Sequence, residues 1–93
     1  MRISTEAARI MVGIISARYG EDCPIWLFGS RADDTKRGGD VDIFVQAESS
    51  DVMHKIDCKR ALTELLDLNV DLVVGNGDKP IHRIAKQTGV RLK

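Results

Sequence analysis

The sequence has little of what marks a secreted, membrane-spanning or strongly basic protein. Its two cysteines, Cys23 and Cys58, are far apart and lack metal-site spacing, so we expect reduced, partly buried thiols. No apolar run approaches the roughly 20 residues needed to cross a bilayer, and the N-terminus has no signal-peptide pattern. The 14 basic and 14 acidic residues cancel, so no global field draws the chain to nucleic acid. We therefore expect a cytoplasmic protein without membrane insertion or sequence-specific nucleic-acid binding.

The chain also lacks internal repeats, low-complexity segments and any linker long enough to divide it. Its 93 residues are enough for one modest core, and its 43% hydrophobic and 30% charged residues are ordinary for a globular protein. We therefore predict a single domain over residues 1–93.

Hydrophobic periodicity predicts the order helix, strand, strand, helix, strand, helix. The expected segments are helices over 4–20, 51–67 and 80–89, strands over 25–28, 40–47 and 69–74, and a short edge strand over 90–92. The fold class is therefore α/β (α+β), a small mixed sheet of about three to four strands with helices packed on one face. The predicted apolar faces of the helices are Ala7, Ile10, Met11, Ile14 and Ile15; Val52, Met53, Ile56, Leu62, Leu65 and Leu66; and Ile81, Ile84 and Ala85.

Acidic side chains gather on one face of the predicted strands. Residues at i and i+2 of a strand share a face, so Asp40 and Asp42 present adjacent carboxylates. Two like charges this close repel unless a cation or a proton intervenes, and oxygen ligands favour magnesium. Asp71 occupies the equivalent face of the next predicted strand, so we expect three carboxylates to meet there.

A glycine and a serine, Gly29 and Ser30, end the first predicted strand. Glycine lets the backbone approach a phosphate closely, and the serine hydroxyl adds a donor. Arg31, which follows directly, can neutralise phosphate charge or stay solvated. The last 15 residues carry five bases and no acid, which fits a solvated helix face or a site for phosphate or a partner. His82, in this segment, is interpreted as a surface histidine.

Two motifs together resemble a known family. Gly29 and Ser30 followed by Gly39-Asp40-Val41-Asp42-Ile43 resemble the signature of the DNA polymerase β-type nucleotidyltransferase superfamily. More narrowly, residues 28–32 and 37–45 resemble the minimal nucleotidyltransferases, small prokaryotic proteins often paired with a helical HEPN-type protein in toxin–antitoxin modules. Many minimal members have Arg-Gly where this chain has Asp33 and Asp34.

The resemblance implies a palm-like core and a Mg²⁺-dependent nucleotidyltransferase. Gly29, Ser30 and Arg31 would hold the nucleoside triphosphate, and Asp40, Asp42 and Asp71 would be the catalytic residues that bind two Mg²⁺ ions. The implied reaction is transfer of AMP from ATP to a hydroxyl. The implied acceptor is a partner such as a HEPN toxin, which makes this chain an antitoxin; its short length predicts that a partner or a second copy completes the acceptor site.

Two alternatives remain open. The first is a catalytically silent antitoxin or regulatory subunit that acts by binding its partner. The second is a metal-binding module that does not transfer a nucleotide. This alternative explains the carboxylates but does not explain Gly29 and Ser30. No base-reading pocket is visible in the sequence, so the nucleotide is left unassigned by the residues themselves.

Overall fold

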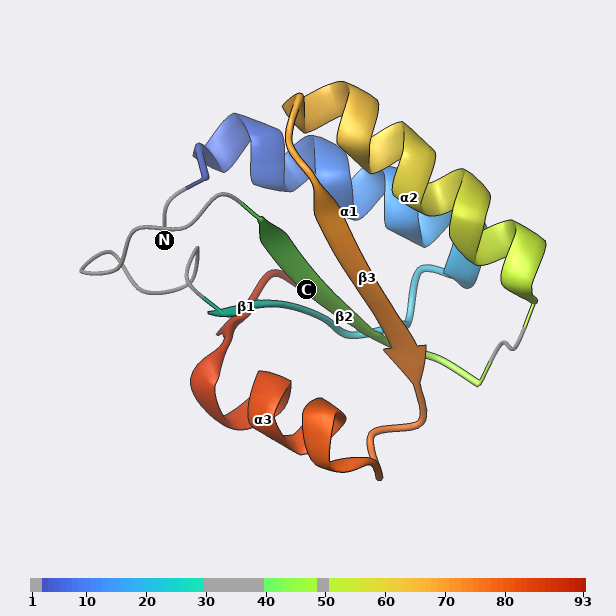
Figure 1. The fold of residues 1–93 in the computed structure, drawn as a ribbon, viewed down its shortest axis with the longest axis vertical. Helices are drawn as coiled ribbons and strands as arrows, with labels where there is room; N and C mark the ends of the chain where they lie inside the picture. The colour runs from blue at the N-terminus through green and yellow to red at the C-terminus, as the bar shows by residue number, and fades with distance from the viewer. Residues whose placement is uncertain (1–2, 30–39, 49–50) are drawn as a thin grey trace.

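The computed structural model describes residues 3–29, 40–48 and 51–93 of the chain. Within these residues the order of elements is the predicted one (Figure 1). The elements are α1 (Thr5–Tyr19), β1 (Ile25–Phe28), β2 (Val41–Gln46), α2 (Val52–Leu66), β3 (Val70–Gly75), α3 (Pro80–Thr88) and β4 (Val90–Arg91). No helix in the described ranges is long and apolar enough to cross a membrane.

The strands form one mixed sheet in the order β3-β2-β1-β4. β1 pairs antiparallel with both β2 and β4, whereas β2 and β3 are parallel and are connected through α2. Parallel neighbours need a long crossover, and the helix predicted between these strands provides it. The mixed α/β fold is therefore confirmed, and the parallel pair places the first residues of β2 and β3 at the same edge.

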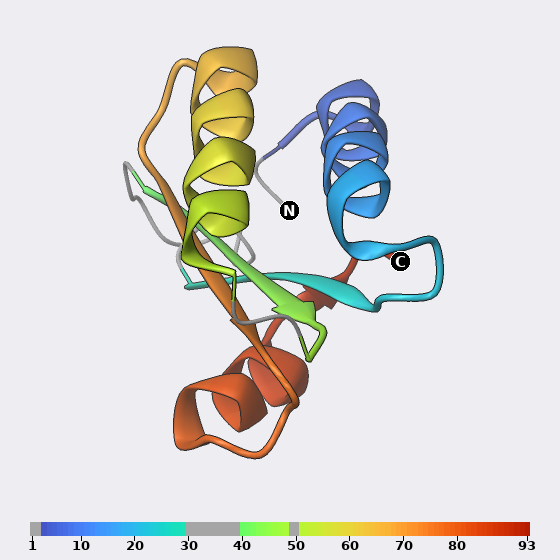
Figure 2. The same cartoon turned by 90° about the vertical axis from the view of Figure 1, so that its right-hand side faces the viewer.

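Helices cover both faces of this sheet. α1 and α2 lie side by side over one face, and α3 lies beneath the other (Figure 2). The first face carries Val41, Ile43 and Val45, which join the main core with Met11 and Leu62. The expectation of helices on one face holds for α1 and α2 and is wrong for α3. The reason is a second apolar cluster on the opposite face, formed by Trp26, Phe28, Phe44 and Ala85.

Side-chain caps fix where the first two helices begin. The Ser4 hydroxyl accepts the Ala7 N–H at 3.1 Å. The Asp51 carboxylate accepts the N–H groups of Met53 and His54 at 3.0 and 3.2 Å. Each cap satisfies backbone donors that the first helical turn leaves without partners.

The rotation of α2 about its axis differs from the prediction. Cys58 and Leu62 are buried, whereas Val52 and Met53 are 66% and 71% exposed and Ile56 is also exposed. At 3.6 residues per turn, a residue two positions from Cys58 lies about 200° around the helix, so Ile56 faces away from the core. Leu65 is exposed as well, and only part of the predicted apolar face is core.

The other two helices show the same kind of correction on a smaller scale. In α1, Met11 and Ile15 are fully buried as predicted, but Ile10 is exposed. In α3, Ala85 is buried, whereas Ile81 and Ile84 are exposed; the second buried side chain is the imidazole of His82, at 3% exposure. The interpretation of His82 as a surface residue is therefore wrong.

Candidate active site

The described residues of the predicted site come together where β1 ends and β2 and β3 begin. Asp42 is the register partner of Phe28 on β1 and of Asp71 on β3. Register partners on neighbouring strands point to the same face, so the Asp42 and Asp71 carboxylates are direct neighbours. Gly29 follows Phe28 immediately. The sheet thus places the end of β1 and the two carboxylates in one row across three strands.

Gly29 lies against the carboxylate of Asp42. Its backbone has φ +73°, in the left-handed region that glycine adopts without strain. A Cβ added at this position would overlap Asp42 Oδ2. The absence of a side chain therefore lets this carboxylate lie directly against the backbone at the end of β1. Ser30 and Arg31, the other predicted phosphate-binding residues, lie outside the described residues.

The charge of Asp42 is poorly compensated. Partial burial is the largest cause that raises the pKa of this carboxyl above its ordinary value, and the negative charges of Asp71 and Asp40 add to it. Burial removes water from the ionised form, and neighbouring anions disfavour a further negative charge. Within the described part of the chain, the groups that shift this pKa are all acidic. A divalent cation beside Asp42 would relieve this repulsion.

Asp40 is set apart from the other two acids. It lies just before β2 and is exposed. It borders a shallow hollow of about 440 Å³ together with Asp67 and Asn69, where α2 leads into β3. Among residues 3–29, 40–48 and 51–93, no three His, Cys, Asp or Glu side chains are grouped so that they could hold a metal ion. The expectation that three carboxylates meet therefore holds for Asp42 and Asp71, which are register partners, and not for Asp40.

This arrangement fits magnesium in one specific respect. Magnesium is commonly bound by one or two carboxylates together with phosphate oxygens of a substrate, rather than by a complete cage of protein ligands. Asp42 with a neighbouring acid could supply the protein part of such a set, and its uncompensated charge is the observation that would favour a cation there.

Sequence reasoning missed the role of His82 in the fold. Its Nδ1 accepts the N–H groups of Gly77 and Lys79 at 3.2 and 3.3 Å, so the ring closes the turn that leads into α3. The ring also stacks on Phe44, with 4.7 Å between centroids. A side chain at Gly75 would overlap the ring. The glycines on either side of Asn76, followed by Pro80 and His82, are the pattern that could have indicated a buried capping histidine.

The chain matches known proteins at the level of a family and of a fold. A family model described as polymerase beta, nucleotidyltransferase, matches residues 22–92. A search of curated proteins gives no significant match. The matched segment contains β1 to β4 and therefore every residue of the candidate site.

Solved structures show the same fold at low sequence identity. A toxin–antitoxin structure with AMP-PNP has a TM-score of 0.79 at 24% identity, over 92% of this chain and 72% of that one. A complex of tri-AMPylated Shewanella oneidensis HEPN toxin with MNT antitoxin has a TM-score of 0.77 at 22% identity, over 98% and 72%. A third structure, also from Shewanella oneidensis, has a TM-score of 0.74 at 19% identity, over 98% and 72%.

Proposed function

Because the chain belongs to the polymerase beta nucleotidyltransferase family, we propose that it transfers a nucleoside monophosphate to a hydroxyl on a partner protein. The donor in this proposal is ATP with Mg²⁺, and the transferred group is AMP. The partner is a HEPN-type toxin, which the transfer silences, so the chain acts as an antitoxin.

The observation that carries the proposal is the row formed by Gly29, Asp42 and Asp71. The close approach of the Asp42 carboxylate to the Gly29 backbone and the raised pKa of Asp42 suit a site where triphosphate and metal arrive together. A purely structural role for Asp42 would favour a partner of opposite charge, since an uncompensated, half-buried carboxylate costs stability. This cost to the stability of the fold supports a role for Asp42 in binding a ligand.

Each residue has a distinct task in the proposed reaction. Asp42 and Asp40 would hold Mg²⁺ together with the phosphates. When bound, the ion supplies positive charge that stabilises the triphosphate and the leaving pyrophosphate. Asp71 is exposed beside Asp42, where it can accept the proton of the acceptor hydroxyl. The acceptor oxygen forms a bond to the α-phosphorus, the bond from that phosphorus to the β-phosphate oxygen breaks, and pyrophosphate leaves.

The partner in this proposal is supported by the solved structures, whose identities to this chain lie below 25%. One is a complex in which a HEPN toxin carries AMP groups and an MNT antitoxin is bound to it. Another is a toxin–antitoxin structure with AMP-PNP, a nucleotide analogue. The exposed apolar side chains Val52, Met53 and Ile56 of α2 also offer this chain a surface for contact with a protein.

A labelling experiment tests the proposal. The chain is incubated with Mg²⁺, ATP and the product of the neighbouring gene as the candidate partner, and AMP on that protein is measured by intact mass. We expect modification with the wild type and with Asp22→Asn, an exposed carboxylate away from the site, and none with Asp42→Asn. A stable complex without modification would replace the proposal by the silent antitoxin, which acts through binding alone.

A further inference from the structure

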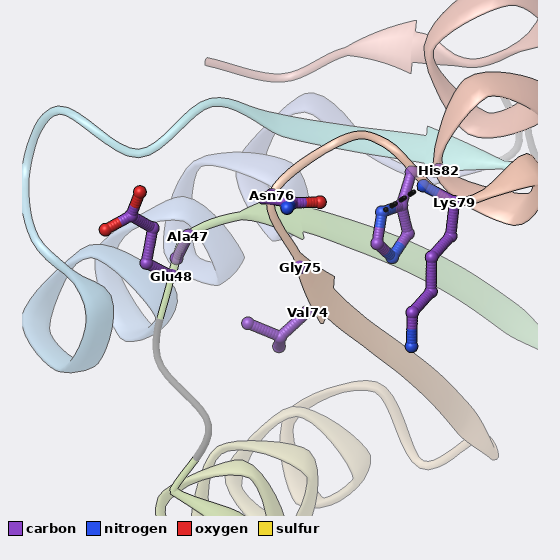
Figure 3. A pocket seen from close by; sticks show the side chains of 7 residues that line it. All are labelled: Ala47, Glu48, Val74, Gly75, Asn76, Lys79 and His82. Atoms are coloured by element: carbon purple, nitrogen blue, oxygen red, sulfur yellow. Dashed lines mark hydrogen bonds between the residues drawn. The ribbon is translucent and has the colours of Figure 1, made fainter.

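A second hollow lies at the opposite end of the parallel strands from Asp42 and Asp71 (Figure 3). It has a volume of about 400 Å³ and is lined by residues that include Glu48, Gly75, Asn76, Lys79 and His82. We call it the strand-end pocket. Asp71 and Gly75, which lines the pocket, are four residues apart on β3, or roughly 13 Å at about 3.3 Å per residue. The strand-end pocket is therefore separate from the candidate active site.

The hydrogen bonds of His82 fix the position of its proton. Nδ1 accepts two backbone N–H groups, from Gly77 and Lys79, so it carries no hydrogen. A neutral imidazole with an acceptor Nδ1 has its proton on Nε2, which is then a donor. No hydrogen bond joins Nε2 to another described residue, and Nε2 is not among the buried polar atoms that lack a partner, so solvent or a ligand can reach it although His82 as a whole is only 3% exposed. A ligand that accepts this hydrogen bond would therefore take the place of water at the Nε2 donor.

The ring cannot easily turn away from the pocket. Phe44 stacks on one side of it, and the backbone of Gly75 lies so close that a Cβ there would overlap the imidazole. The turn donors hold Nδ1 in place as well. A donor fixed in this way loses little conformational entropy when a ligand binds.

The charges in the strand-end pocket are divided between two sides. The Lys79 side chain extends on the side of His82, and Glu48 lies across the pocket from both (Figure 3). Lys79 is also the N-cap residue of α3, and this nine-residue helix directs its positive dipole end toward this side. An anion is favoured beside Lys79 and His82, and a hydrogen-bond donor is favoured beside Glu48.

We propose that the strand-end pocket binds a small molecule through an oxyanion, a phosphate or carboxylate, that accepts the Nε2–H of His82 and pairs with the Lys79 ammonium. The ligand also carries a hydroxyl or amino group that donates to Glu48. The pocket volume suits a molecule up to the size of a nucleoside monophosphate. The site does not depend on the transfer reaction, because it shares no residue with the row of Gly29, Asp42 and Asp71.

The test is a titration of the ¹⁵N-labelled protein, without divalent metal, with inorganic phosphate, acetate and AMP in separate arms. We expect the amide signals of Gly75, Asn76 and Gly77 and the Nε2 signal of His82 to shift with each. AMP should bind most tightly, because its hydroxyls can reach Glu48. A preference of phosphate over acetate, or the reverse, identifies which oxyanion the pocket takes. If none of the three shifts these signals at millimolar concentration, the proposal is overturned.

Variants separate this site from the active site and from surface charge. Lys79→Gln should weaken AMP binding by about tenfold, the worth of one charge-assisted hydrogen bond. Lys59→Gln, which removes an exposed charge from α2, should leave it unchanged. Asp42→Asn should also leave it unchanged while abolishing the proposed transfer, so the two proposals fail independently. Shifts that are the same in Lys79→Gln as in the wild type overturn the assignment.

Discussion

Removing the charge of Asp42 should make the protein more stable. Asp42→Asn keeps the size and much of the hydrogen-bonding capacity of the side chain, and it removes the repulsion with Asp71, its register partner. Like charges on directly opposed strand positions are destabilising by roughly 0.2–1 kcal/mol. For a domain of this length, about 0.2–1 kcal/mol corresponds to a rise in Tm of about 1–8 °C. Differential scanning calorimetry without divalent metal measures this directly.

The dependence of the folding stability on pH tests the same prediction independently. Because the folded state raises the pKa of Asp42, the folded protein holds this proton at pH values where the unfolded chain has lost it. Stability should therefore fall as pH rises from the ordinary aspartate value through the raised pKa, and the penalty should be complete above it. In Asp42→Asn this contribution to the change of stability with pH is missing. The difference between the two profiles isolates the group.

A double-mutant cycle provides the control. If repulsion is the cause, Asp71→Asn should also stabilise, and the second substitution should add less in the double mutant than alone. Added Mg²⁺ should stabilise the wild type and have a smaller effect on Asp42→Asn, because a ligand stabilises only the state that binds it. A lower Tm for Asp42→Asn in metal-free buffer would refute the reasoning, since it would show that the carboxylate has a favourable partner.

Three further predictions concern the fold around the site. Gly29→Ala should lower the free energy of unfolding by about 1–2 kcal/mol, because alanine is strained at φ +73°. The control Gly13→Ala lies in open space on α1 and should raise the free energy of unfolding by about 0.5–1 kcal/mol. Urea unfolding compares the two variants, and equal effects would contradict the prediction for Gly29. Burial lowers the pKa of His82, so stability should fall as pH drops from the ordinary histidine value through the lowered pKa, and His82→Asn should lack this dependence in urea midpoints. Leu62→Ala should lower the free energy of unfolding by about 2–5 kcal/mol and Met53→Ala by less than about 0.5 kcal/mol, since Leu62 is buried and Met53 is exposed. Similar decreases for both variants in thermal melts would show that Met53 belongs to the core, as its place on the predicted apolar face of α2 implies.

The strands and the meeting of two carboxylates could be predicted because strand parity has a period of two. In residues 41–46, apolar and polar positions indicate that Val41 faces the main core and that Asp42 points to the opposite face of the sheet. The long connection through α2 favours a parallel pairing of β2 with β3. The register that sets Asp42 opposite Asp71 follows from the fold, and it confirms the expected neighbourhood of these two side chains. Their catalytic role stays a prediction.

The helix faces were harder to predict because several rotations bury similar numbers of apolar side chains. In α2, the sequence alone does not distinguish whether Ile56 or Cys58 is buried, and the packing of the folded protein buries Cys58 and exposes Ile56. His82 was missed for a related reason. A histidine in a basic helix is usually solvated, and its burial depends on donors from a turn that the sequence does not position in space.

The central claim, transfer of a nucleoside monophosphate, is tested most directly by the position of the label in the donor. Two parallel reactions with the HEPN-type partner and Mg²⁺ use ATP labelled at the α-phosphate and at the γ-phosphate. We predict that the α-label becomes covalently attached to the partner, that the γ-label is released as pyrophosphate, and that Asp42→Asn abolishes both. Attachment of the γ-label, or undiminished α-labelling with Asp42→Asn, would contradict it.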